Sequence, residues 1–324
     1  METLDLVRHR SLLGSIAIVA VVAFAFSLGT LLAQTPAAGS ATEQTKTERG
    51  QIPADHYDPD DIKTYEDVVT EDRQVSVRDQ TFTVHFYRRR DETARTLAIY
   101  ACGDGGWRGL APRTAQQLAH VGFAVAGIDS KIYLRELSSA QNPLTFKQIA
   151  SDYAVIAAAL RSYAAVDAKA PVYVYGWSLG AGLAIAVGSD IDTRANWAGI
   201  VAIGLPAQNQ LVSGVGGNYT DLKNPANSRF GFRSDALLSG LSPVPLVMIE
   251  STSDSASPQK VSRKLFAAAR DPKQYVLIKA ENHRFTGARN EFYSALSNAV
   301  AWIRQVRGDA NTAAQVTSLK KQDQ

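Results

Sequence analysis

A serine flanked by glycines stands where an apolar, β-branched run gives way to a run of small residues. Residues 176–180 read Gly-Trp-Ser-Leu-Gly. The run before them predicts a strand, and the run after Ser178 predicts a helix. In such a strand-turn-helix elbow the serine takes a strained backbone conformation, so Gly176 and Gly180 are needed where strand and helix approach. The pattern predicts a nucleophilic Ser178 raised above the end of a sheet.

A serine hydroxyl needs a base to take its proton, and the base needs an acid to orient it. In this architecture the acid and then the histidine follow the serine, each just beyond a strand. His283 is the sole histidine after Ser178, and it stands between the last predicted strand and the last predicted helix. Asp254, in the loop after the run VPLVMIEST (244–252), is the predicted acid. Glu250 is its nearest rival, but we assign it to the strand.

The same chemistry requires N–H donors for the oxyanion that forms on the substrate. One is the backbone N–H of Leu179, the residue after the predicted nucleophile. The other is expected in the glycine-rich loop ACGDGGWRGL (101–110), where Asp104 is the first choice and Gly105 the alternative. Glycines in this loop let the backbone come close to a substrate.

Each of these residues also has an ordinary structural interpretation. Ser178 is a favoured residue for capping a helix N-terminus, and Asp254 lies in a composition typical of turns. His283 could be an exposed loop histidine. Trp107 and Trp177 flank the predicted site and could line it or belong to the core. The order serine, aspartate, histidine at three strand ends is harder to explain by these roles together.

The elements around these residues alternate between strands and helices. A hairpin is predicted at 73–90, turning at Arg78, Asp79 and Gln80. Short apolar runs predict buried, mostly parallel strands at 96–102, 122–130, 171–177, 197–205, 244–252 and 274–280. Helical patterns lie at 113–121, at 145–165, directly after Ser178, at 257–270 and at 290–307. A hairpin followed by alternating strands and helices predicts an α/β fold with a doubly wound, mostly parallel sheet.

The N-terminal residues 1–33 are predicted to be a signal anchor. Residues 11–33 are apolar without a charge and follow Arg8 and Arg10, which places the N-terminus in the cytoplasm and exports the rest. The run is longer than the apolar core of most cleaved signal peptides, so an uncleaved anchor is favoured over a cleaved signal. A polar linker (34–65) leads to the folded domain (66–307), and a polar tail (308–324) follows it.

Composition excludes several classes of function. The 324-residue chain has a formal net charge of +3, which gives no reason to expect nucleic-acid binding. Its single cysteine, Cys102, excludes an internal disulfide and reads as a small buried apolar residue. The five histidines are scattered without metal-ligand spacing, so we predict neither a metal site nor a cofactor.

The elbow and the order of its partners resemble the α/β-hydrolase superfamily. Within it, GDGGW (103–107), GFAVAGIDS (122–130) and KIYL (131–134) resemble the VirJ/AcvB-like bacterial virulence proteins. The resemblance implies a periplasmic serine hydrolase acting on aminoacylated phosphatidylglycerol, with lysyl-phosphatidylglycerol the leading candidate. It also implies a membrane lipid as substrate, attachment to the inner membrane, and a secretion-system protein as a candidate partner.

Two other classes of function remain as alternatives. A hydrolase fold without activity could serve as a binding or scaffold module in secretion. A reductase is disfavoured, because the glycines at 176–182 follow several strands and the Y-x-x-x-K of 275–279 lies in a predicted strand. The polar insertion at 206–243 could gate a site. Its Asp221 and Asp235, or Glu281, are candidates to receive a lysyl ammonium group.

Overall fold

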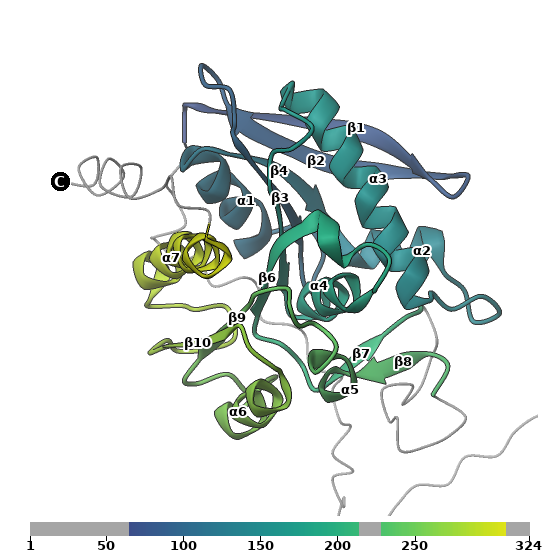
Figure 1. Cartoon of the computed structure of the whole chain (residues 1–324), viewed down its shortest axis with the longest axis vertical. Helices are drawn as coiled ribbons and strands as arrows, with labels where there is room; N and C mark the ends of the chain where they lie inside the picture. The colour runs from purple at the N-terminus through teal and green to yellow at the C-terminus, as the bar shows by residue number, and fades with distance from the viewer. Residues whose placement is uncertain (1–64, 214–227, 309–324) are drawn as a thin grey trace, which may run out of the picture. The chain divides into compact units, whose positions relative to one another are not determined.

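The computed structural model describes residues 65–213 and 228–308, and the statements below concern these residues. Their main feature is an eight-stranded sheet (Figure 1). Across the sheet the strands are β1 (Val68–Val77), β2 (Gln80–Arg89), β4 (Phe123–Ile128), β3 (Thr96–Ala101), β5 (Val172–Trp177), β6 (Trp197–Ile203), β9 (Leu246–Ser251) and β10 (Lys273–Ile278). Only β2 runs in the direction opposite to the other seven strands of the sheet. The carboxyl ends of the other central strands therefore meet at one edge of the sheet.

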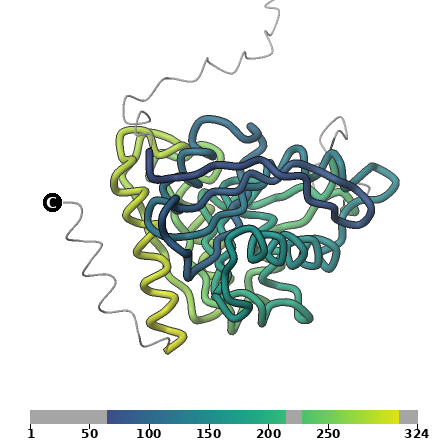
Figure 2. Tube along the Cα trace, turned by 90° about the horizontal axis from the view of Figure 1, so that it is seen from above, coloured from purple at the N-terminus to yellow at the C-terminus, as the bar shows by residue number. Residues whose placement is uncertain are grey.

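Helices cover both faces of this sheet, and Figure 2 follows the chain from the purple hairpin to the yellow final helix. One face carries α1 (Leu110–His120) and α7 (Arg289–Arg307). The other carries α2 (Ser130–Leu137), α3 (Phe146–Ala164), α4 (Leu179–Ser189) and α6 (Gln259–Ala268). This is the two-sided layering that the alternating pattern predicts.

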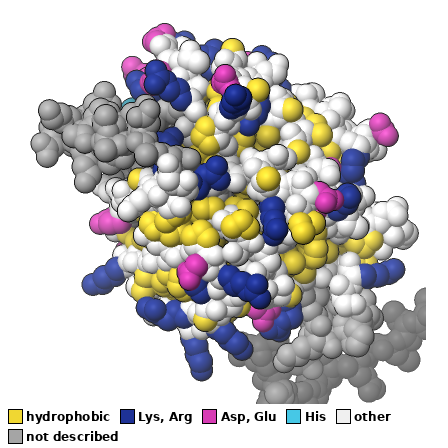
Figure 3. All heavy atoms as spheres, viewed as in Figure 1, with side chains coloured by type: hydrophobic (Ala, Val, Ile, Leu, Met, Phe, Trp, Pro, Cys, Tyr) yellow, Lys and Arg dark blue, Asp and Glu magenta, His cyan; other side chains and the backbone are white. Residues whose placement is uncertain are grey.

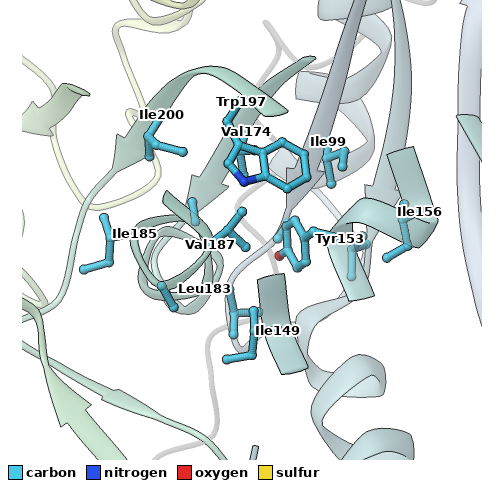
Figure 4. Close-up of a cluster of buried hydrophobic side chains, with 14 of the residues drawn as sticks. Ile99, Ile149, Tyr153, Ile156, Val174, Leu183, Ile185, Val187, Trp197 and Ile200 are labelled. Atoms are coloured by element: carbon cyan, nitrogen blue, oxygen red, sulfur yellow. The ribbon is translucent and has the colours of Figure 1, made fainter. Parts of the chain in front are cut away.

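Each face of the sheet has its own apolar core, because successive strand residues point to opposite faces. In β3, Leu97 and Ile99 pack toward α3 and α4, whereas Ala98 and Tyr100 pack toward α1 and α7. Figure 4 shows part of the first core, where isoleucines of α3 and aliphatic residues of α4 surround Trp197. Both faces are buried, which explains why the central strands read as continuous apolar runs.

The predicted hairpin is confirmed, and its turn is held by an ion pair between the partly exposed Arg78 and the buried Asp152. Arg78 and Asp79 both have positive φ angles, as a tight two-residue turn requires. Arg78 Nε donates to Oδ1 of Asp152 at 2.8 Å, and the Tyr133 hydroxyl donates to Oδ2 at 2.7 Å. Asp152 thus joins the hairpin tip to α2 and α3.

The six predicted central strands and the five predicted helices are also confirmed, with ends shifted by up to four residues. The described residues also form five elements that were not predicted: α2, the 3-10 helix η2 (Arg194–Asn196), the strands β7 (Gln208–Gln210) and β8 (Gly231–Arg233), which pair in a small sheet, and the short α5 (Ser234–Leu238). β7, β8 and α5 lie within the predicted insertion at 206–243. On the face seen in Figure 3, basic and acidic side chains are interspersed.

The predicted anchor at 11–33 lies outside the described residues. Within the described ranges, no helix is long and apolar enough to cross a membrane.

Candidate active site

Ser178 occupies a strained turn between β5 and α4. Its φ of 55° and ψ of −117° lie in a region that side-chain-bearing residues rarely adopt. Its backbone N–H donates to the carbonyl of Ile203 at 2.8 Å, which ties the turn to β6. Ser178 stands at the N-cap position of α4, yet its side chain makes no capping hydrogen bond. Helix capping therefore does not account for a serine here.

The glycines of the elbow stand where no side chain would fit. A Cβ at Gly176 would overlap the backbone of Gly180, and a Cβ at Gly180 would overlap the carbonyl of Ala101. Farther along α4, the side chain of Asn209 in β7 lies against the Cα of Gly182. The glycines thus let β5, α4 and the insertion approach one another around Ser178.

Asp254 and His283, which are 29 residues apart in sequence, meet beyond the ends of β9 and β10. Nδ1 of His283 lies 2.5 Å from Oδ2 of Asp254. The other oxygen, Oδ1, accepts the N–H groups of Ala256 at 2.8 Å and Ser257 at 2.7 Å. The carboxylate therefore closes its own turn and orients the imidazole at the same time.

The imidazole of His283 is packed on two sides. Trp177 lies against it with ring centroids 5.4 Å apart, and the Trp177 indole N–H donates to the His283 carbonyl at 3.3 Å. On another side lies Gly204, where a Cβ would stand 2.6 Å from Cε1 of His283. Its Nε2 is buried and has no hydrogen-bond partner in the described part of the chain. The nitrogen that a general base would use is thus unoccupied.

Among the described residues, no direct hydrogen bond joins Oγ of Ser178 to Nε2 of His283. Ser178 donates its N–H to Ile203, and the next residue, Gly204, contacts the imidazole. Catalytic hydrogen bonds are often long in structures without substrate and tighten when substrate binds. A structure without substrate that lacks this hydrogen bond is therefore consistent with His283 as the base for Ser178.

Two carboxyl groups near β9 have opposite pKa shifts. At Asp254 burial alone would raise the pKa, but the His283 hydrogen bond and charge, with the N–H groups of Ala256 and Ser257, hold it below its usual value. At Glu250 burial raises the pKa well above its usual value, and the nearby Asp254 charge adds to this. Glu250 lies within β9, as predicted, and accepts only the Leu205 N–H at 3.3 Å.

The loop between β3 and α1 borders Ser178. A Cβ at Gly103 would stand 3.2 Å from Cβ of Ser178. Asp104 and Gly105 are exposed, and no atom lies within 4 Å of where a Cβ of Gly105 would stand. The Leu179 N–H is the first of α4, where no earlier carbonyl of the helix can accept it. The Leu179 N–H is thus available next to Ser178, and the exposed Asp104 and Gly105 directly follow the residue that approaches it.

Cys102 and Trp107, the two other residues of this loop discussed above, contribute to packing. Cys102 is fully buried, and burial raises the pKa of its thiol to about 12, so it is the small apolar residue that we predicted. Trp107 stacks on His85 with centroids 4.8 Å apart, and its ring fills the space left by Gly127. It belongs to the packing of the loop on β2 and β4.

The carboxylates predicted to bind a lysyl ammonium group differ in whether they are already paired with a basic side chain. Asp235 is already paired with Arg233 at 2.5 Å. Glu281 is exposed in the loop of His283, where its side chain lies against Gly287. Asp221 lies outside the described residues.

A cavity of about 430 Å³ lies far from these groups. It is lined by the C-terminal part of α3, by Arg307, and by the first residues of β5 and β6, Val172 and Trp197. Ser178, Asp254 and His283 follow the last residues of their strands. The cavity is therefore at the opposite edge of the sheet and does not serve the candidate site.

Three residues at this site escaped the sequence analysis: Gly204, Asp129 and Ser130. Gly204 is the penultimate residue of the run WAGIVAIGL, and nothing in the sequence indicated its positive φ of 55° or its contact with His283. Asp129 and Ser130 are the last residues of the run predicted as a strand at 122–130, whereas β4 ends at Ile128. Polar side chains at the carboxyl end of that run were the available signal.

Comparison with known structures agrees with this architecture. A dienelactone hydrolase from Klebsiella pneumoniae is 12% identical, with a TM-score of 0.56 over 74% of this chain and 99% of that one. The α/β hydrolase GrgF from Penicillium sp. sh18 is 13% identical, with a TM-score of 0.54 over 73% and 98%. Est1E from Butyrivibrio proteoclasticus is 12% identical, with a TM-score of 0.51 over 72% and 98%. The chain therefore has the α/β-hydrolase fold.

A family match narrows this class. Residues 95–209 match the family described as bacterial virulence protein VirJ, so this segment of the chain is similar to that family. The match contains Ser178 and the loop of Asp104, and it ends before Asp254 and His283. No curated protein matches the chain significantly.

Proposed function

We propose that this protein is a serine ester hydrolase in which Ser178 is the nucleophile, His283 the base and Asp254 the orienting acid. The observation that carries the proposal is the 2.5 Å contact between His283 and Asp254, with Nε2 of the histidine left open beside the strained Ser178. A structural histidine would have no need of an open buried nitrogen.

The reaction would proceed through an acyl-enzyme. Oγ of Ser178 attacks the ester carbonyl carbon while Nε2 of His283 takes the hydroxyl proton, and the carbonyl electron pair moves to oxygen. The backbone N–H groups of Leu179 and Asp104, with Gly105 as the alternative to Asp104, hold this oxyanion. Collapse releases the alcohol, which takes the proton from His283. Water then attacks the acyl carbon with His283 again as base, releasing the acid and restoring Ser178.

The substrate class proposed is an aminoacylated phosphatidylglycerol, with the lysyl lipid first. The class comes from the resemblance to VirJ/AcvB-like proteins, and the match of residues 95–209 to VirJ supports that resemblance. A second support is the position of Asp104, whose carboxyl group is exposed next to the residue that contacts Ser178. A negative charge there disfavours a developing oxyanion unless the substrate brings a compensating cation. An aminoacyl ester carries an ammonium group one carbon from its carbonyl, and the exposed Glu281 is available for a side-chain ammonium.

The proposed location is the periplasm, with attachment to the inner membrane through residues 11–33. The apolar run and its basic flank support this placement. Tethering would raise the effective concentration of lipid headgroups near Ser178. Export with the segment cleaved would leave the reaction unchanged.

The test uses the full chain in detergent with lysyl-phosphatidylglycerol and a nitrophenyl ester, and follows lysine and nitrophenol release. Ser178→Ala should abolish both, and Ser189→Ala, at the far end of the same helix, should abolish neither. Nitrophenol release without lysine release would reject the lipid assignment and keep the hydrolase. Absence of both, together with no labelling by a fluorophosphonate, would favour a non-catalytic accessory role in secretion.

A further inference from the structure

The two carboxylate oxygens of Asp129 accept hydrogen bonds from different segments, one from a helix and the other from a loop. It follows β4 and is 8% exposed. Oδ1 accepts the N–H groups of Lys131 at 2.9 Å and Ile132 at 3.1 Å, which caps the N-terminus of α2. Oδ2 reaches away from the helix and accepts the backbone N–H of Trp107 at 3.0 Å. Capping needs only one of these oxygens.

The loop that Oδ2 holds is the one that carries Asp104 and Gly105. Its backbone folds on itself, with the Gly106 N–H donating to the Gly103 carbonyl at 3.2 Å. Gly106 has a φ of 83°, and a Cβ there would stand 3.2 Å from Oδ2 of Asp129. Glycines at three of these positions give the loop more backbone freedom than other residues would. Such a loop needs an external contact to keep one conformation.

The next residue holds the other end of the same loop. Ser130 is fully buried, and its hydroxyl donates to the Cys102 carbonyl at 2.6 Å. That carbonyl also accepts the Gly180 N–H at 3.0 Å, next to Ser178. Asp129 and Ser130 thus fix both ends of the segment between Cys102 and Trp107. The N–H groups of Asp104 and Gly105 lie between the two anchors.

We propose that Asp129 is a positioning residue for the oxyanion donors of this loop, acting through Trp107, with Ser130 as the second anchor. The proposal rests on the proposed ester hydrolysis at Ser178. Misplaced donors weaken binding of the oxyanion, which exists only in the transition state and the tetrahedral intermediates. Loss of the anchor should therefore lower kcat and leave KM nearly unchanged.

The test is Asp129→Asn in the full chain, assayed on a nitrophenyl ester. The asparagine oxygen can keep the cap on α2, but its amide nitrogen cannot accept the Trp107 N–H. We expect kcat to fall about 30- to 100-fold, somewhat less than the loss of a whole oxyanion donor, with KM within about twofold. The affinity for a trifluoromethyl ketone, whose adduct with Ser178 carries the oxyanion, should fall by the same factor as kcat/KM.

The matched control is Asp152→Asn, because Asp152 is also a buried carboxylate with polar partners, and these partners, Arg78 and Tyr133, lie outside this loop. It should lower the thermal midpoint and leave kcat within about twofold when assayed well below that midpoint. Ser130→Ala should repeat the kcat loss of Asp129→Asn more weakly. If Asp129→Asn does not fold, the loss of kcat in Ser130→Ala alone tests the positioning role.

The outcomes separate this inference from the proposed function. A wild-type protein that turns over no ester contradicts the proposed function, and the positioning role falls with it. A wild-type protein that is active and loses activity in Ser178→Ala upholds the proposed function. Within that case, Asp129→Asn with wild-type kcat and ketone affinity but a lower thermal midpoint would mean that Asp129 only caps α2. An equal kcat loss in Asp152→Asn would also overturn the proposal.

Discussion

Glu250 and Asp254 are carboxyl groups four positions apart at the end of β9, and their surroundings shift their pKa values in opposite directions. Asp254 accepts two backbone N–H groups and contacts the imidazole of His283, which stabilises its charged form. Glu250 is enclosed within the strand and accepts one N–H, so its neutral form is favoured. The environment thus separates one charged and one neutral acid, and only the charged one reaches His283.

Asp254→Asn should lower kcat by about 10³- to 10⁴-fold on a nitrophenyl ester. The amide oxygen can keep the N–H groups of Ala256 and Ser257, so the amide nitrogen would face His283. The histidine would then carry its proton on Nε2 and could not accept that of Ser178. Initial rates measure this effect, with Glu250→Gln as the matched carboxyl-to-amide control. Rates of Asp254→Asn within tenfold of wild type would assign the acid elsewhere.

Glu250→Gln should stabilise the protein at alkaline pH relative to wild type. The pKa of Glu250 is raised in the folded state, so the folded state holds a proton that the unfolded state releases above the ordinary pKa of 4.5. Stability from this group is complete below that value and declines as pH rises, by at most about 1.4 kcal/mol per pH unit, until the folded pKa is reached. Urea unfolding at several pH values measures the difference. The two proteins should agree near pH 4 and diverge above it; parallel curves would mean that Glu250 is ionised.

Gly204→Ala should impair catalysis more than stability. Its Cβ would stand 2.6 Å from Cε1 and 2.9 Å from Nδ1 of His283, so the imidazole must move away from Asp254. A displacement of about 1 Å in a catalytic group can cost about 100-fold in rate. The control is Gly308→Ala, which has a φ of 72° with no atom within 4 Å of the added Cβ and shares only the backbone strain. Equal kcat values for both variants would show that the packing on Gly204 is not needed.

Asp104→Asn should change specificity more than activity. The backbone N–H of residue 104 is retained, while the carboxylate that would attract a substrate ammonium group is removed. We expect kcat/KM for a lysyl ester to fall about tenfold, and that for a matched uncharged acyl ester to stay level or rise, because a like charge near the oxyanion is gone. The ratio of the two values is the readout. An unchanged ratio would remove Asp104 from substrate selection.

Much of this architecture followed from local sequence patterns. The central strands have both faces buried, so each appears as a continuous apolar run. In the helices between them, apolar residues recur with helical spacing. Gly176, Ser178 and Gly180 were readable because an elbow places a strict steric demand on adjacent positions. The helix α2 was missed, since its eight residues are too few for a clear period and its start is decided by Asp129.

Residue types and short-range spacing were enough to predict the order of strands and helices, the place of Ser178 in the chain, and the candidates Asp254 and His283. Three contacts were visible only in the folded chain: the carboxyl group that meets His283, the room that Gly204 leaves for the imidazole, and the hold of Asp129 and Ser130 on the loop of Asp104. These contacts join strand ends that are distant along the chain. They depend on how parallel strands align at one edge of the sheet, which spacing along the sequence does not encode.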